Sequence, residues 1–321
     1  MLNLLFGSVS VAHIAVMGTG RVGGEVAFTL VFERYVNELS LVDSSPGVAD
    51  MVKEEMHHAV GNHGFDVKIN AYTKSSQVVD ADLIVVAAGF PRTPEMSRRD
   101  LATKNAGAVK EVVENSLANN PGAWYFVITN PVDAMTTLAN KAAQGKRQVI
   151  GTGTNLETSR FRTILSRRLD VPIGLVEGFV GGEHGEAAAP LWSTVKINGV
   201  ALDEYLKKTR KTLDRASCEN YVKEVSREII RVLGGTRHGP AGSFIEIIRG
   251  VMLNTGRVMS YGRLRKFDNT PEPVYVTVPA RIARSLGPDI WDLLTESEKA
   301  AIREAAGAIY KTYCEARGEK A

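Results

Sequence analysis

Short apolar runs alternate with longer amphipathic segments through the first half of the chain. The apolar runs predict strands at Ile14–Met17, Leu39–Val42, Val67–Asn70, Leu83–Ala87, Tyr125–Ile128 and Gln148–Ile150. The segments between them predict helices at Val22–Glu33, Ala49–Val60, Leu101–Asn119 and Pro131–Gln144. Strands that alternate with helices form βαβ units and a mainly parallel sheet. Near-continuous apolar strands fit a sheet that is covered on both faces.

The alternation changes after about Gly153. We expect the second half to contain a helix, a glycine-rich segment, a strand, a long charged helix, another helix, a hairpin and a final helix. The first helix is expected over Leu156–Leu169, the glycine-rich segment over Gly178–Gly185 with the strand directly after it, and the long charged helix over Asp203–Leu233. The next helix is expected to start near Ser243, the hairpin to lie within Arg257–Thr277, and the final helix to start at Thr295. Thr295 with Glu298 has the spacing of a capping box. The predicted fold is therefore α/β, with a Rossmann domain over residues 1–153 and an α+β catalytic domain over residues 154–321.

Composition narrows the class of protein. The chain has 321 residues, of which 44% are hydrophobic and 23% charged, as in ordinary globular proteins. The net charge of +3 comes from scattered basic residues rather than a basic face, so we expect no nucleic-acid partner. There is no apolar run of about 18 residues and no basic segment before the apolar start, so we expect a cytoplasmic protein without a membrane span. Cys218 and Cys314 lie far apart, and we expect reduced thiols and no metal site.

A glycine-rich segment follows the first predicted strand and opens the first predicted helix. It consists of Gly18, Thr19, Gly20, Arg21, Val22 and Gly23, with the spacing G-x-G-x-x-G. Such glycines permit a tight turn and a close approach of pyrophosphate to the helix N-terminus. Asp43 ends the next predicted strand, where a carboxylate accepts hydrogen bonds from a ribose 2′-OH and repels a 2′-phosphate. The segment predicts NAD as cofactor and disfavours NADP, with some tolerance left by Ser44 and Ser45.

Three residues of the second half are candidates for acid–base chemistry and carboxylate binding. His184 lies in the polar, glycine-flanked segment Gly181–Glu186, and imidazole suits reversible proton transfer near neutral pH. Glu157 and Arg160 are three residues apart on one predicted helix and share a face. A structural histidine and a surface ion pair remain open alternatives. In the functional interpretation, Glu157 supports His184 and Arg160 binds a substrate carboxylate bidentately.

Two further segments leave predicted strands at the edge of the sheet where α/β proteins bind ligands. The segment Gly89–Arg98 contains Arg92 and Arg98 and is predicted as a lid that brings cations to an anionic substrate. An ordinary charged loop is the alternative interpretation. Asn130 ends another strand and could hydrogen-bond both the substrate and the nicotinamide region.

Taken together, these residues resemble the lactate/malate dehydrogenase family. The similarity covers nearly the whole chain: the glycine segment, Asp43, Ala88–Arg92, Ile128–Pro131, Gly151–Arg162 and Gly182–Gly185 follow one another as they do in the family. The resemblance implies that His184 is the acid/base, that Arg160 binds the shared carboxylate and that Arg98 stabilises the substrate oxygen. It also implies that Asn105, Ile128, Thr129 and Asn130 lie along the cofactor, and that the protein is a homo-oligomer, either a dimer or a tetramer.

Within this resemblance, one lid position separates the substrates. Malate dehydrogenases have arginine and lactate dehydrogenases glutamine, and here the residue is Arg92. An arginine pairs with the second carboxylate of oxaloacetate, whereas pyruvate would leave it buried and unpaired. We therefore expect a malate dehydrogenase, an enzyme of the tricarboxylic acid cycle. A lactate dehydrogenase or broad 2-oxo acid reductase is the alternative, and a catalytically silent nucleotide-binding protein is another.

The chain departs from the family pattern at three acidic positions. The family usually has aspartate where this chain has Glu157 and Glu186, and glycine where it has Glu95. Glutamate keeps the charge but adds a methylene, so the geometry of the His184 partner must adjust. A misplacement of about 1 Å at a catalytic centre can cost on the order of a hundredfold in rate.

Overall fold

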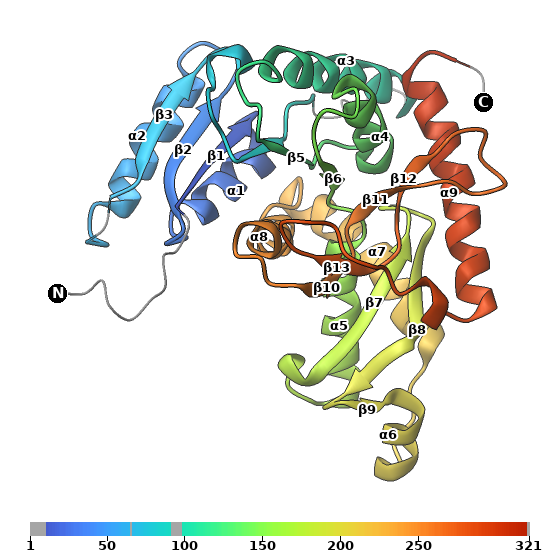
Figure 1. The fold of residues 1–321 in the computed structure, drawn as a ribbon. Helices are drawn as coiled ribbons and strands as arrows, with labels where there is room; N and C mark the ends of the chain where they lie inside the picture. The colour runs from blue at the N-terminus through green and yellow to red at the C-terminus, as the bar shows by residue number, and fades with distance from the viewer. Residues whose placement is uncertain (1–10, 65, 91–97, 320–321) are drawn as a thin grey trace.

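The computed structural model of the protein describes residues 11–64, 66–90 and 98–319, without the side chains of residues 98 and 99. Its first half is a βαβ array, as predicted, with element bounds within three residues of those expected (Figure 1). The elements are β1 Ala12–Met17, α1 Arg21–Leu30, β2 Val36–Val42, α2 Val48–Val60, β3 Lys68–Tyr72, β4 Leu83–Val86, α3 Arg98–Ser116, β5 Trp124–Val127, α4 Val132–Ala142 and β6 Val149–Gly151.

The second half mixes helices with antiparallel strands. Its elements are α5 Asn155–Leu169, β7 Val176–Gly182, β8 Ala188–Ile197, β9 Val200–Ala201, α6 Leu202–Thr209, α7 Arg215–Leu233, α8 His238–Met252, β10 Arg257–Met259, β11 Gly262–Arg265, β12 Val274–Thr277, β13 Ala280–Ile282 and α9 Glu296–Ala316. In Figure 1, β7 and β8 extend away from the βαβ array, and α9 runs along the side of the molecule beside them.

One large sheet passes through both halves. Its strand order is β3-β2-β1-β4-β5-β6-β11-β12-β7-β8-β9, and the first six strands are parallel. The junction with the antiparallel part is narrow, because β11 pairs with β6 only through Gly262 and Gly151. The fold is therefore a parallel α/β sheet followed by an α+β unit, in agreement with the sequence.

Alternate residues of β1 face opposite layers of helices, as the period of two along a strand requires. Ile14 and Val16 are fully buried against α1 and α8, whereas Ala15 and Met17 are fully buried against α3 and α4. This two-sided burial explains why the first-half strands are continuously apolar in sequence.

Three predictions for the second half need correction. The long helix expected over Asp203–Leu233 is two helices, because α6 ends at Thr209 and the next residue, Arg210, has a left-handed conformation (φ 55°). Asp214 then caps α7 by accepting a hydrogen bond from the Ser217 N–H. The helix expected from Ser243 starts five residues earlier, at His238. Pro240 is accommodated in its first turn, where a missing N–H does no harm.

The expected hairpin is present but smaller than predicted. β11 pairs with β12, whereas β10 pairs with the later β13 in a separate two-stranded sheet. The capping box of the last helix is confirmed: the Thr295 side chain accepts from the Glu298 N–H, and the Glu298 side chain accepts from the Thr295 N–H.

Candidate active site

Hydrogen bonds on two sides hold the start of α5 and fix the direction of its first turn. The Asn155 amide donates to the main chain and side chain of Ser243 on α8, at 2.9 and 3.1 Å. The Thr154 hydroxyl donates to the Val180 carbonyl on β7. Glu157 lies in this first turn, where the helix dipole favours a negative charge.

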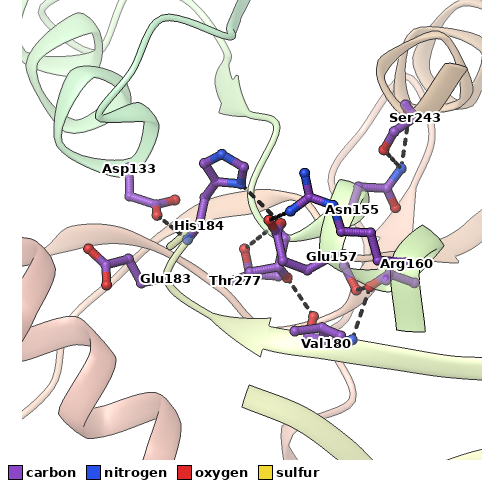
Figure 2. A network of polar contacts seen from close by, with 12 residues as sticks. Asp133, Asn155, Glu157, Arg160, Val180, Glu183, His184, Ser243 and Thr277 are labelled. Carbon is purple, nitrogen blue, oxygen red and sulfur yellow. Dashed lines mark hydrogen bonds and ion pairs between the residues drawn. The ribbon is translucent and has the colours of Figure 1, made fainter. Parts of the chain in front are cut away.

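The Glu157 carboxylate bridges the guanidinium of Arg160 and the imidazole of His184. One oxygen accepts from the Arg160 guanidinium at 3.1 Å, and the other lies 3.0 Å from His184 Nδ1. Glu157 is 3% exposed, so this carboxylate is almost entirely removed from water. Figure 2 shows the three side chains converging from α5 and from the turn after β7. A buried charge needs such paired partners, and Glu157 has two.

His184 is held at two points. Its ring contacts Glu157, and its main-chain N–H donates to Asp133 Oδ2 at 2.8 Å. The turn that carries it is closed by a hydrogen bond of 3.3 Å from the Glu183 N–H to the Ala187 carbonyl. About 20% of the His184 side chain remains accessible, and Nδ1 is occupied, so Nε2 is the nitrogen available to a substrate.

Opposing effects set the protonation of this cluster. Burial alone would lower the pKa of His184, but Glu157, with a contribution from Asp133, raises that pKa above its ordinary value despite Arg160. Burial alone would raise the pKa of Glu157, but His184 and Arg160 hold it below its usual range. The Glu157 carboxylate therefore favours the protonated form of His184, and His184 in turn favours the ionised form of Glu157.

A cavity of about 290 Å³ lies over this cluster. It brings together six residues predicted from the sequence: Val22, Ile128, Asn130, Glu157, Arg160 and His184. Its wall also contains residues that sequence reasoning missed, among them Thr152, Lys223, Arg227, Thr236 and Phe244. The cavity therefore joins the helix of the glycine segment, the ends of the β5 and β6 strands, and α7.

The glycine segment has the tight geometry that pyrophosphate binding requires. Gly18 has φ 102°, and a Cβ there would lie 2.8 Å from the Ala88 nitrogen. A Cβ on Gly23 would lie only 1.9 Å from the Gly18 carbonyl oxygen, so no larger residue fits. Gly20 precedes α1 and has open space around it. This cradle fits a dinucleotide phosphate at the helix N-terminus.

Asp43 faces this segment from the end of β2. One of its oxygens accepts from the Thr19 N–H and hydroxyl, at 3.1 and 3.0 Å, and the other accepts from the Ser45 N–H at 3.0 Å. Burial alone would raise the pKa of Asp43, but these hydrogen bonds hold it below its usual range. The residue is therefore a carboxylate at neutral pH, as ribose binding requires.

Arg21 takes a different direction from its neighbours in the segment. Its guanidinium donates to the carbonyls of Leu233 and Gly235, at 3.3 and 3.5 Å. The side chain therefore links the glycine segment to the end of α7, while Val22 on the same turn lines the cavity.

Asn105, from α3, ties the ends of two strands together. Its side-chain oxygen accepts from the Phe90 N–H at 2.8 Å, and its amide donates to the Asn130 carbonyl at 2.7 Å. The Thr129 hydroxyl is 2.8 Å from the Ala88 carbonyl. The peptide bond between Asn130 and Pro131 is cis. These contacts hold the strand ends at the side of the cavity that the sequence assigned to the nicotinamide.

The predicted lid is only partly described. Arg92 and Glu95 lie outside the described residues, and Arg98 is the first residue of α3, with no description of its side chain. Glu186, the second unusual glutamate, is exposed and forms an ion pair with Arg227 at 2.6 Å.

Other kinds of site find no support in the part of the chain that is described. Within it, no group of three or more histidine, cysteine or acidic residues could hold a metal ion. No described helix is long and apolar enough to cross a membrane. Cys218 and Cys314 are both buried as free thiols.

Two family models together match nearly the whole chain. The model described as "lactate/malate dehydrogenase, NAD binding domain" matches residues 12–151. The model described as "lactate/malate dehydrogenase, alpha/beta C-terminal domain" matches residues 154–315.

Curated relatives carry both names of the family. A "Malate dehydrogenase" of Sulfurisphaera tokodaii is 37% identical, over 94% of this chain and 95% of its own length. One of Sulfolobus acidocaldarius is 36% identical over the same shares of the two chains. An "L-lactate dehydrogenase" of Shouchella clausii is 31% identical over 94% of each chain.

Solved structures have the same architecture. The "minor L-lactate dehydrogenase" of Enterococcus mundtii matches with a TM-score of 0.88 at 25% identity, over 95% of this chain and 98% of its own. The malate dehydrogenase of Salinibacter ruber matches with a TM-score of 0.83 at 23% identity, over 95% and 98%, which is a likeness of fold.

Proposed function

The chain belongs to the lactate/malate dehydrogenase family, and within it we propose that this protein is a malate dehydrogenase, which interconverts (S)-malate and oxaloacetate with NAD. The bridge from Glu157 to His184 and Arg160 is the observation that carries the dehydrogenase chemistry. The malate assignment rests on Arg92 in the sequence and on the relatives at 36–37% identity.

In this proposal, one carboxylate of malate binds the Arg160 guanidinium, which lies beside the base. The second carboxylate binds Arg92, and Arg98 lies beside the hydroxyl oxygen; both roles are inferred from the sequence. The C2 hydroxyl then faces His184 Nε2, because Glu157 occupies Nδ1. Bound NAD supplies the hydride acceptor, and the cavity wall at Val22, Ile128 and Asn130 is suited to its nicotinamide end.

His184 performs the proton transfer. Neutral His184 accepts the hydroxyl proton at Nε2 during malate oxidation, and the resulting imidazolium donates it back to the carbonyl oxygen during oxaloacetate reduction. The Glu157 carboxylate stabilises the imidazolium and holds the ring in one tautomer. Oxaloacetate reduction therefore requires protonated His184, and the raised pKa of this residue extends the protonated form toward neutral pH.

NAD is favoured over NADP in this proposal because Asp43 is a carboxylate at the ribose end of the glycine segment. A 2′-phosphate would meet this charge without a compensating cation from the described residues 43–48. We also propose a cytoplasmic homo-oligomer acting in the tricarboxylic acid cycle. Light scattering coupled to size exclusion would test the assembly, and a monomer at micromolar concentration would contradict it.

A lactate dehydrogenase or broad 2-oxo acid reductase is the second candidate. It is supported by the relative from Shouchella clausii, which carries the lactate name at 31% identity. The chemistry at His184 and Arg160 would be the same, and only the contact to the substrate's second carboxylate would differ.

The substitution Arg92→Gln separates the two candidates. If Arg92 binds the second carboxylate, oxaloacetate reduction should fall by about a hundredfold or more, whereas pyruvate reduction should be spared or increased. The measurement is kcat/KM for both acids with NADH, in the wild type and the variant. Equal losses with both acids would contradict the role of Arg92 as the discriminating contact.

A further inference from the structure

Asp133 is a buried acid beside the reaction centre that the mechanism above does not use. It is the second residue of α4 and is 3% exposed. Its neighbours Val132, Ala134 and Met135 are buried apolar residues. Figure 2 shows Asp133 approaching His184 from the side opposite Glu157. An acid in such surroundings is costly to bury, so its presence calls for an explanation.

The two carboxyl oxygens of Asp133 have different surroundings. Oδ2 accepts the main-chain N–H of His184 at 2.8 Å. Oδ1 is buried and has no hydrogen-bond partner among the described residues. Oδ1 faces Gly262, where a Cβ would lie 3.7 Å away. Among the described residues, the one hydrogen bond that the Asp133 carboxyl group makes is thus to the main chain of the proposed acid/base.

The turn around His184 is closed by two main-chain hydrogen bonds of 3.3 Å, from Glu183 to Ala187 and from Ala188 to Gly185, but neither of them involves His184 itself. His184 lies between Gly182 and Gly185, which have φ 84° and 156°. Glycine permits these conformations but restricts the chain less than other residues do. Two contacts from outside the turn compensate: Glu157 holds the ring, and Asp133 holds the main chain. Losing the second contact would leave the ring tethered while the backbone beneath it could move.

We propose that Asp133 is a positioning residue of the acid/base centre, which anchors the main chain of His184 and adds its negative charge to that of Glu157 when the imidazolium forms. This inference rests on the proposed function of His184 and deepens it. Asp133 touches neither substrate nor cofactor in this account. It acts through the position and the charge state of His184.

The charges around Asp133 support a role in protonation as well as in position. Burial, supported by the charges of Glu183 and Glu157 and opposed by the contact with His184, raises the pKa of Asp133 to about 7. Asp133 therefore changes charge in the range in which an imidazole works. Among the described residues, the charged groups that act on His184 are Asp133 from α4 and Glu157 and Arg160 from α5. Burial and Arg160 oppose the imidazolium, whereas the two acids favour it.

Two substitutions separate the anchor from the charge. Asp133→Asn keeps an oxygen that can accept the His184 N–H but removes the charge. Asp133→Leu removes both and keeps the branched shape of the side chain, although its two methyl groups are larger than the carboxyl oxygens. Ser116→Ala is the matched control: Ser116 is fully buried and hydrogen-bonded to Tyr125 and the Val112 carbonyl, so it reports the loss of a buried hydrogen bond elsewhere.

The decisive measurement is an NMR titration of the His184 ring in full-length protein, which does not depend on turnover. The chain has six histidines, and a His184→Gln spectrum assigns the signal. We expect Asp133→Asn to lower the pKa of His184 by about half a unit to one unit, since a nearby opposite charge shifts a pKa by about 1–3 units when fully ionised. We expect Ser116→Ala to leave the titration unchanged.

Kinetics test the anchor. For the 2-oxo acid that the wild type reduces, Asp133→Leu should lower kcat by about ten- to a hundredfold, with NADH affinity unchanged, whereas Asp133→Asn should retain most of kcat. An unchanged His184 titration in Asp133→Asn would overturn the role of the charge. Full kcat in Asp133→Leu would overturn the role of Asp133 as the anchor of the His184 main chain. If that variant does not fold, loss of kcat in Asp133→Asn at its own pH optimum would overturn it. A wild type that reduces no 2-oxo acid would overturn the proposed function instead, while the titration would still measure the influence of Asp133.

Discussion

The carboxylate of Glu157 offers the most direct perturbation of the proposed chemistry. Glu157→Gln keeps the size of the side chain and an oxygen that can accept from His184 Nδ1, but it removes the charge. In the wild type the two groups are 3.0 Å apart and Glu157 is 3% exposed. At about 4 Å between charge centres and an effective dielectric constant of about 20, the attraction is about 4 kcal/mol.

This attraction sets an upper limit of about three units on the pKa shift, since one unit corresponds to about 1.4 kcal/mol. Surveyed effects of a close opposite charge are about 1–3 units, and we expect the pKa of His184 to fall by that amount in Glu157→Gln. The sign follows from the charge: Glu157 favours the imidazolium, so its removal restricts the protonated form to lower pH. At neutral pH the protonated fraction, and with it oxo acid reduction, should fall by about tenfold or more.

The assay is the pH dependence of kcat/KM for oxo acid reduction at saturating NADH. Glu157→Asp is the control, because it keeps the charge but is one methylene shorter and cannot span both His184 and Arg160 at their present distances. The alkaline limb of the Glu157→Asp pH profile should stay within about half a pH unit of that of the wild type, while kcat/KM of the variant falls. A Glu157→Gln profile that superimposes on the wild type, or that shifts to higher pH, would refute the reasoning.

Three other changes have defined outcomes. Arg160→Lys removes bidentate carboxylate binding and should raise KM for the oxo acid by about tenfold or more. Arg162→Lys is the control and should leave KM unchanged, because Arg162 donates to a main-chain carbonyl of β7. Equal effects of the two substitutions in steady-state assays would contradict the role of Arg160. Asp43→Asn removes the charge that repels a 2′-phosphate and should increase kcat/KM with NADPH relative to NADH; an unchanged cofactor ratio would count against Asp43. Glu298→Gln should make the free energy of unfolding less dependent on pH in acid. Burial alone would raise the pKa of Glu298, but hydrogen bonds from Ser193 and Thr295 lower it. The wild type therefore has the full stabilisation above the unfolded pKa of about 4.3 and loses it as pH falls through the folded pKa. Urea denaturation between about pH 3 and 6 measures this, and parallel curves for the two proteins would contradict it.

The first half of the fold could be predicted because its signals are local. The strands of the parallel sheet are buried on both faces and read as apolar runs, and the spacing of Gly18, Gly20 and Gly23 reports a turn within a few residues. The fold of the second half could be predicted less completely from its sequence. The break between α6 and α7 falls at Arg210, without a glycine or proline to mark it. The pairing of β10 with β13 joins segments more than twenty residues apart, and nothing in either sequence specifies the partner.

The same distinction holds for the site. Glu157 and Arg160 share a helical turn, so their spacing alone predicted that they would be neighbours. The contact between Asp133 and His184 joins residues 51 positions apart and depends on how α4 and β7 meet across the sheet junction. A signal for Asp133 was present, since it is an acid among apolar helix residues. Lys223 and Arg227 resembled the solvated face of a charged helix, and only the fold places that face on the cavity.

We propose that this protein discriminates a dicarboxylic oxo acid through His184, Arg160 and Arg92. The most direct test measures kcat/KM for NADH oxidation with oxaloacetate and with pyruvate, side by side at several pH values. We expect a preference for oxaloacetate of at least about a hundredfold, with activity falling as pH rises through the pKa of His184. Comparable rates with the two acids would identify a general 2-oxo acid reductase, and NADH binding without turnover of either acid would contradict the proposed chemistry itself.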